Sequence, residues 1–132
     1  MPEGVDYASA NVTAGTGLEL NYVQNKVFAY SGNIEITGTT DPVTMLEFVT
    51  GAQTIEGYVQ FQSIEPGSND LQFFIELNSI RIATLSINGA KEFYHEGIRV
   101  IIPPYTNVKC TGLNIDAATG RDSTATFTGT IL

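Results

Sequence analysis

Apolar residues recur at every second position in short blocks along most of this chain, and this alternation limits the folds that it can adopt. In the block IEGYVQFQSI, residues 55–64, Val59 and Phe61 alternate with Gln60 and Gln62. Successive side chains of a β-strand point to opposite faces, so such a block predicts a strand with one buried and one solvated face. The pattern therefore predicts antiparallel strands, separated where Gly, Pro, Asn and Asp interrupt the blocks.

Nine blocks of this kind can be recognised, and their close spacing is typical of a sandwich or a barrel. They cover residues 26–31, 33–38, 43–50, 55–64, 70–77, 80–87, 98–102, 106–115 and 123–131. We predict an all-β fold, an antiparallel and jelly-roll-like β-sandwich of about 8–10 strands. A chain of 132 residues fits one domain. We place this domain at residues 18–132, behind a flexible N-terminal arm of residues 1–17 that is rich in small polar residues.

One β-turn can be predicted from a two-residue signal in the sequence. Asn88-Gly89 favours a type I′ hairpin, because both central residues of that turn need a positive φ. The hairpin would place Ile87 opposite Ala90. Residues 90–97 offer an alternative, a single helical turn that ends at a glycine.

Two prolines and two changes of parity predict where strands end or bend. Pro103 and Pro104 lack the N–H group that pairing needs, so they must end the preceding strand and form a corner. In a sandwich, such a corner passes the chain from one sheet to the other. The apolar positions also change parity within residues 80–87 and beyond Gly112, and each change predicts a bulge or a bend.

The charge balance excludes some partners. Fourteen acidic and six basic residues give a net charge of −8, which repels phosphate backbones. No segment has the apolar length of a membrane helix, and the first residues do not resemble a signal peptide. We therefore expect neither nucleic acid nor a membrane as a partner. The single cysteine, Cys110, excludes an internal disulfide and every zinc pattern built on paired cysteines.

Few residues could support catalysis or metal binding. His95 has glutamates nearby, but no motif supplies a nucleophile for it, so we expect a solvated histidine. Cys110 has the parity of a core residue rather than of a reactive thiolate. Asn114, Asp116 and Asp122 offer oxygen ligands for calcium, yet their spacing is that of an ordinary turn. We expect no catalytic residue, no cofactor, no metal and no enzyme activity.

Large apolar side chains also occupy positions that the alternation assigns to the solvent side. Four of them are Met45, Tyr58, Phe74 and Ile101. Exposed apolar surface needs cover, and a contact between subunits would provide it. We therefore take these four residues as a candidate oligomer interface.

Three segments resemble a known class of proteins. They are NKVFAYSGNIEITGTTDPVTMLEFVTG, ELNSIRIATLSING and IRVIIPPYTNVKCTG, which begin at Asn25, Glu76 and Ile98. Together they resemble the small β-sandwich structural proteins of tailed bacteriophages, particularly those from marine metagenomes, over roughly residues 26–115. The resemblance implies a non-catalytic homo-oligomer, such as a trimer, that contacts other virion proteins. It implies a location in the virion after assembly in the cytoplasm of a bacterial host.

Two functions follow as hypotheses. The first is a self-associating viral structural protein, which decorates a capsid or forms part of a tail or head fibre. The alternative is a carbohydrate-binding module, because the same architecture can display glycan sites. Such sites present exposed aromatic side chains, and in this chain, which has no Trp, the candidates are Tyr94 and Tyr105, with Tyr30 and Tyr58 as further platforms.

Overall fold

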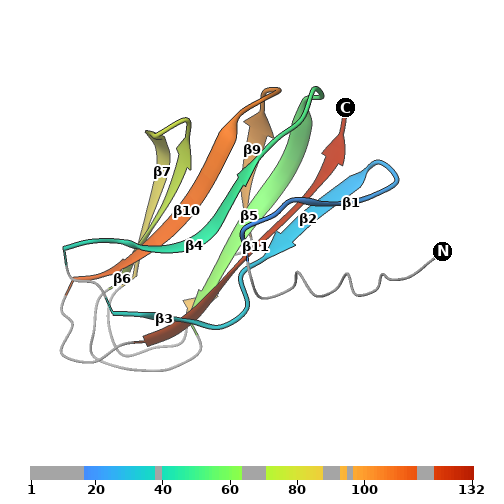
Figure 1. Cartoon of the computed structure of the whole chain (residues 1–132). Coiled ribbons are helices and arrows are strands. Elements are labelled where there is room, and N and C mark those ends of the chain that lie inside the picture. Colours follow the sequence, from blue (N-terminus) through green and yellow to red (C-terminus); the bar gives the residue numbers. More distant parts are fainter. Residues whose placement is uncertain (1–16, 38–39, 64–70, 88–92, 95–96, 116–120) are drawn as a thin grey trace.

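The computed structural model describes residues 17–37, 40–63, 71–87, 93–94, 97–115 and 121–132, and these form two layers of strands (Figure 1). Sheet A contains β1 (Asn21–Val23), β2 (Lys26–Tyr30), β3 (Ile34–Ile36), β5 (Ile55–Ser63), β8 (Phe93–Tyr94), β9 (Ile98–Ile102) and β11 (Arg121–Ile131). Sheet B contains β4 (Val43–Val49), β6 (Leu71–Leu77), β7 (Ile80–Ile87) and β10 (Asn107–Asn114).

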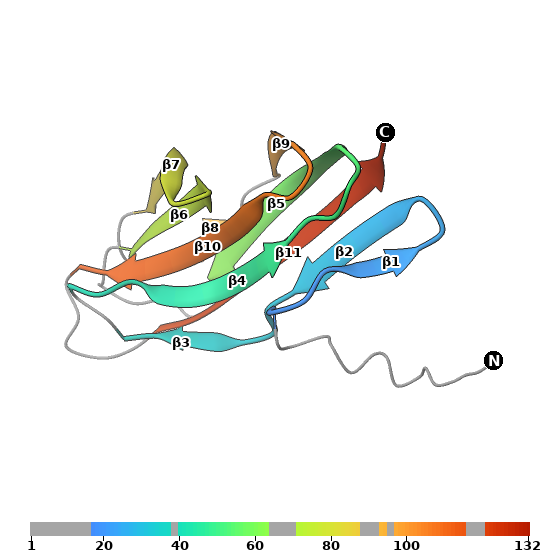
Figure 2. The ribbon, with the colours of Figure 1, turned by 45° about the horizontal axis from the view of Figure 1, so that its top comes forward.

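Every strand pair is antiparallel. The order in sheet A is β1-β2-β11-β5-β8, with β3 also on β11 and β9 also on β5, and the order in sheet B is β4-β10-β6-β7. Figure 2 shows β11 lying between β2 and β5. The predicted antiparallel β-sandwich is confirmed. Among the described residues there is no helix that could cross a membrane.

The core lies between the sheets and follows from the alternation. On β5, Val59 and Phe61 are buried, while Gln60 between them and Tyr58 before them face outward. Two aromatic pairs join the layers. The ring centroids of Phe61 and Phe73 are 4.7 Å apart, and those of Phe48 and Phe127 are 5.3 Å apart. Each pair takes one ring from each sheet, so the aromatic contacts hold the two layers together.

The Pro103-Pro104 corner carries the chain from β9 in sheet A to β10 in sheet B, as predicted. A second crossing, from β4 to β5, lies beside it, and Thr50 joins the two. The Thr50 hydroxyl accepts a hydrogen bond from the Thr106 N–H and donates one to the Pro103 carbonyl, both at 2.9 Å. The Tyr105 N–H also donates to the carbonyl of Gly51 at 2.8 Å. Because Thr50 and Thr106 are buried, these bonds replace water at the crossing.

The predicted bulge within residues 80–87 is confirmed. Glu76 pairs with Arg81 and Ile75 with Ala83, which leaves Ile82 as the extra residue of β7. The irregularity predicted beyond Gly112 is different, because β10 pairs with β6 without interruption. It occurs against β4, where the pairing changes between Cys110 and Thr111.

This second bulge explains why one prediction was wrong. Cys110 pairs with Leu46 and Thr111 with Thr44, so Met45 is the extra residue of β4. Its side chain is fully buried rather than exposed, as is that of Leu46. A bulge sends two consecutive side chains toward the same face, which the regular alternation of a strand does not. Met45 is therefore a core residue and cannot belong to an interface on the surface.

Phe74 is also buried, although its parity was predicted correctly. It lies on the outer face of β6 and is only 3% exposed. The guanidinium carbon of Arg81 lies 3.8 Å from the centre of its ring, so a cation–π contact covers this face. The ring needs no partner subunit, and the prediction that Phe74 belongs to an exposed interface is wrong.

Some predictions fall on residues outside the described ranges. They include the turn at Asn88-Gly89 and the contact of Ile87 with Ala90, as well as most of the N-terminal arm. Gly17, the first described residue, is buried against β4, and its carbonyl accepts a hydrogen bond from the Glu47 N–H at 2.7 Å. The strand that follows Asn88-Gly89, β8, pairs with β5 in the other sheet.

Candidate functional site: a groove along β11

The outer faces of the two sheets differ in chemistry. On sheet B, four charged residues stand opposite one another across the strands: Glu47, Lys109, Glu76 and Arg81. Their signs alternate, which is the arrangement that stabilises neighbouring strands at a solvated face. The outer face of sheet A has uncharged side chains at its centre, so it is the better candidate for binding an uncharged ligand.

Threonines form the middle of that outer face. Thr124, Thr126, Thr128 and Thr130 occupy alternate positions of β11 and share its outward side, while Ala125 and Phe127 between them are buried. The threonine side chains are short. The residues that pair with them on the neighbouring strands have longer side chains, so β11 forms the floor of a groove.

The walls of the groove come from β2 and β5. Thr128 lies between Phe28 on β2 and Tyr58 on β5, according to the strand pairing. The rings of Phe28 and Tyr30 are neighbours along β2, with centroids 5.1 Å apart. The Tyr58 side chain is 51% exposed. Two aromatic walls and a hydroxyl floor therefore face the solvent together.

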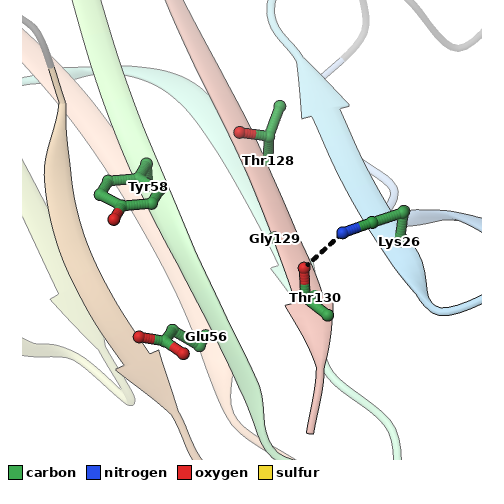
Figure 3. Close-up of a pocket in the computed structure, with 6 residues that line it drawn as sticks. All are labelled: Lys26, Glu56, Tyr58, Thr128, Gly129 and Thr130. Atoms are coloured by element: carbon green, nitrogen blue, oxygen red, sulfur yellow. Dashed lines mark hydrogen bonds between the residues drawn. The ribbon is translucent and has the colours of Figure 1, made fainter.

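A hollow of about 210 Å³ lies at one end of the groove (Figure 3). The hollow is lined by Lys26, Glu56, Tyr58, Thr128, Gly129 and Thr130. The Lys26 ammonium donates a hydrogen bond of 3.1 Å to the Thr130 hydroxyl. On the opposite wall, Arg99 forms an ion pair with Glu56. Lys26 and Glu56 thus line the hollow from opposite sides, and the Tyr58 side chain lies on the same strand as Glu56 (Figure 3).

The groove provides hydrogen-bonding groups and an aromatic surface, which suit binding. Ligand sites combine apolar walls with a few polar groups that fix orientation, and both are present. Within the described ranges, no three His, Cys, Asp or Glu side chains gather as a metal site would require.

The predicted interface residues divide into two groups. Tyr58 and Ile101 are each about half exposed, at 51% and 50%, and lie on the outer face of sheet A. Glu56 stands between them, because it pairs with Ile101 on β9 and is two positions from Tyr58 on β5. Met45 and Phe74 are buried, as described above. The structure therefore brings only half of the predicted interface to the surface.

The predicted glycan-binding tyrosines do not form one site. Tyr105 is 71% exposed, but it lies at the proline corner and not on the face of a sheet. The backbone of Tyr94 pairs with Gln62 at the edge of sheet A, and its side chain lies outside the described part of the structure. Tyr30 and Tyr58 share the outer face of sheet A, on opposite sides of β11.

The residues considered for catalysis or metal binding are not brought together. His95 and Asp116 lie outside the described ranges. Asn114 is buried and donates a hydrogen bond of 3.1 Å to the Ile36 carbonyl, which assigns its amide a structural role. Asp122 stands opposite Glu35, across the pairing of β11 with β3.

Cys110 is a core residue, as the sequence predicted. Burial raises the pKa of its thiol from 9.0 to about 12, and the Glu76 carboxylate adds a smaller upward contribution. We expect the native protein not to react with an aromatic disulfide reagent at neutral pH and to react once it is unfolded. A raised pKa also means that the thiol's contribution to stability is present below about pH 9 and is lost as the pH rises toward 12.

The alkaline loss of stability can be measured by urea unfolding between pH 8 and pH 11. A Cys110→Ala variant is expected to lose less stability over this range than the wild type, since it has no thiol to ionise. Equal losses in the two proteins, or rapid labelling of the native thiol, would contradict the prediction.

The groove itself was not predicted, although its floor has a sequence signal. Thr124, Thr126, Thr128 and Thr130 alternate with other residues in STATFTGTIL, so they must share one face of a strand. The sequence does not show that this strand lies between two others with larger outward side chains. That arrangement depends on the order of strands in the sheet.

The fold defines this chain as a β-sandwich domain. No protein-family model matches the chain, and no curated protein matches it. Among solved structures it is similar to the CBM36-1 domain of a multidomain xylanase from the hindgut metagenome of Trinervitermes trinervoides. The similarity has a TM-score of 0.48 and 10% sequence identity, and it covers 83% of each chain.

Proposed function

We propose that this protein is a non-catalytic carbohydrate-binding module, and that the groove along β11 is its binding site. The observation that carries the proposal is the exposed Tyr58 ring beside a floor of threonine hydroxyls, in a hollow of about 210 Å³. A sugar ring has an apolar face, which can stack on an aromatic side chain, and a rim of hydroxyls that need hydrogen-bonding partners. The groove offers both kinds of contact at one place.

The charges around the hollow are suited to hydrogen bonding with a neutral sugar. Lys26 already bonds to Thr130, and Arg99 already pairs with Glu56. Sugar hydroxyls can donate to the Glu56 carboxylate and accept from the Lys26 ammonium without either charge being buried alone.

Tyr58→Ala is the variant that tests the proposal. We expect it to lower the affinity for a neutral polysaccharide at least tenfold, because truncating an aromatic anchor typically costs ~1.4 kcal/mol or more. Affinity electrophoresis in gels that contain cellulose derivatives, xylan or mannan would identify a ligand, and isothermal titration calorimetry would measure its affinity.

Tyr105→Ala is the matched control, since it removes another exposed tyrosine, at the proline corner. It should bind as the wild type does, and Tyr58→Phe should retain most of the affinity. If Tyr105→Ala abolishes binding and Tyr58→Ala does not, the site lies at the corner and the groove is not the binding surface.

A second candidate function is a self-associating structural subunit of a virus particle, as the sequence resemblance implies. Tyr58 and Ile101 favour it, because both are about half exposed and lie close together on the outer face of sheet A. A contact between copies would remove this apolar surface from water. In this function the protein is located in the virion, and its partners are copies of itself and other virion proteins.

Light scattering coupled to size exclusion separates the two functions in the same samples. A carbohydrate-binding module loses its glycan affinity in Tyr58→Ala with no change in mass. An oligomer that dissociates in Ile101→Ser, together with no affinity for any polysaccharide, would favour the structural subunit.

A further inference from the structure

The groove continues along β11 beyond the hollow. The hollow ends at Thr128, but the next outward residue, Thr126, lies between Tyr30 on β2 and Gln60 on β5. Thr124 follows, beside Gln62. The pattern of a short hydroxyl side chain between longer ones is therefore repeated at Thr126, and Thr124 has a longer neighbour on the β5 side.

The length of this floor suits a chain of sugars rather than a single one. Thr130 lies six positions after Thr124, which corresponds to about 20 Å at ~3.4 Å per residue of an antiparallel strand. Neighbouring threonines on the same face are then ~7 Å apart. The four side chains form a row on the outer face of β11 that a linear chain could follow through several units.

The distribution of charge along the groove indicates which kind of polysaccharide it can bind. Lys26 and Glu56 lie beside Thr130, and Arg99, which pairs with Tyr58 at the level of Thr128, forms its ion pair with Glu56. Between Thr128 and Thr124 the outward residues of the floor and walls are uncharged: Phe28, Tyr30, Tyr58, Gln60, Gln62 and the threonines.

Carboxylates lie beyond one end of this uncharged stretch, where Asp122 and Glu35 face each other beyond Thr124. At the other end Glu56 is paired with Arg99, and Lys26 donates to the Thr130 hydroxyl. The stretch between Thr128 and Thr124 offers no cation to a carboxylate or sulfate group, and the net charge of −8 of the whole chain disfavours an anionic polysaccharide.

From the groove we infer that the ligand is a neutral, unbranched polysaccharide that lies lengthwise along β11. Its units contact the threonine hydroxyls in turn, and the aromatic side chains of β2 and β5 flank it. This inference rests on the proposed carbohydrate-binding function and specifies its ligand. Walls on both sides of the floor exclude a chain that carries side branches at each unit.

The dependence of affinity on ligand length tests the inference. For the neutral cello-, xylo- or manno-oligosaccharide series that binds, we expect the wild-type affinity to rise at least tenfold from disaccharide to hexasaccharide. Thr126→Val removes one hydroxyl from the extended part of the floor and keeps its shape. It should weaken hexasaccharide binding about fivefold, the equivalent of one net hydrogen bond of ~1 kcal/mol, and leave disaccharide binding unchanged.

Two further variants complete the experiment, in which calorimetry measures the affinities. Tyr30→Ala removes a wall beside Thr126 and should also affect only the longer ligands. Thr84→Val makes the same change as Thr126→Val on the exposed outer face of sheet B, and it should have no effect.

The outcomes that overturn the inference can be told apart from failure of the proposed function. Equal affinity for disaccharide and hexasaccharide, with Tyr58→Ala still harmful, would overturn the extended groove alone. Tighter binding of oligogalacturonate than of every neutral series would overturn the neutral ligand alone. Absence of wild-type binding to any of these saccharides would overturn both.

Discussion

Gly57→Ala is expected to destabilise the protein strongly, although it adds only one methyl group. A Cβ at this position would lie 2.6 Å from the Thr128 carbonyl oxygen and 2.7 Å from two ring carbons of Phe127. Neither neighbour can move easily, since one is backbone in a central strand and the other is a fully buried ring. We expect a loss at the upper end of the ~1–3 kcal/mol that is typical of an overpacked core.

Urea unfolding followed by circular dichroism would measure the loss, and Gly51→Ala is the control. A Cβ at Gly51 would have its nearest neighbour, the Tyr22 hydroxyl, 3.8 Å away, so this variant should be as stable as the wild type. Adding Phe127→Leu to Gly57→Ala should cost less than the sum of the two changes, because a smaller side chain removes the clash. An unchanged unfolding midpoint in Gly57→Ala would contradict the expected packing of β5 against β11.

Thr50→Val is the second variant with a large expected effect. It keeps the shape of the side chain but removes the hydroxyl that bonds to the Thr106 N–H and the Pro103 carbonyl. The Thr106 N–H would then lack this bond in a buried place, whereas the exposed Pro103 can turn its carbonyl group to water. An unsatisfied buried group costs ~1–3 kcal/mol, so we expect a loss of about 1–3 kcal/mol in the free energy of unfolding.

Thr50→Ser retains the hydroxyl and should lose much less stability than Thr50→Val in the same unfolding measurement. Thr84→Val, on the exposed outer face of sheet B, measures how much stability a Thr→Val substitution loses where no buried hydrogen bond is broken. Equal losses of stability in Thr50→Ser and Thr50→Val would contradict the expected contribution of these hydrogen bonds.

The positions of most strands could be predicted because alternation is a local property. Residues 80–87 and 98–102 were predicted as strands with the bounds that the structure gives to β7 and β9. One strand was missed, β1, with three residues. The two-residue strand β8 lies in the segment that the hairpin prediction assigned to a second strand, but it pairs with β5 instead. So few residues cannot show a period of two, and such strands form because a neighbouring strand offers unpaired backbone groups.

The errors at Met45 and Phe74 have different physical causes. A bulge is a mismatch between two strands, so the sequence of β4 alone could not show that Met45 is its extra residue. At Phe74 the alternation was correct, but a long side chain from the next strand covers the ring. Whether a ring on an outer face is buried therefore depends on whether a neighbouring Arg packs its aliphatic stem and its guanidinium over that ring.

The candidate site was only partly visible in the sequence. Tyr58 was selected for its exposure, which the structure confirms, and Tyr30 was named as a further platform. That these two residues lie on either side of one threonine strand depends on the sheet order β2-β11-β5. Strands far apart in the chain became neighbours there, and local patterns do not contain that information.

The place of β11 in the fold has a consequence for how the protein is made. It is synthesised after every strand that it joins, yet β2, β3 and β5 all pair with it. Until a ribosome has added Arg121–Ile131, a nascent chain exposes the backbone edges of those strands, which are the kind of edge that promotes aggregation. At a translation rate of ~5–20 residues per second, the edges of β5 stay exposed for several seconds after β5 has been synthesised. The same order means that a prematurely terminated copy lacks the threonine floor of the proposed binding site.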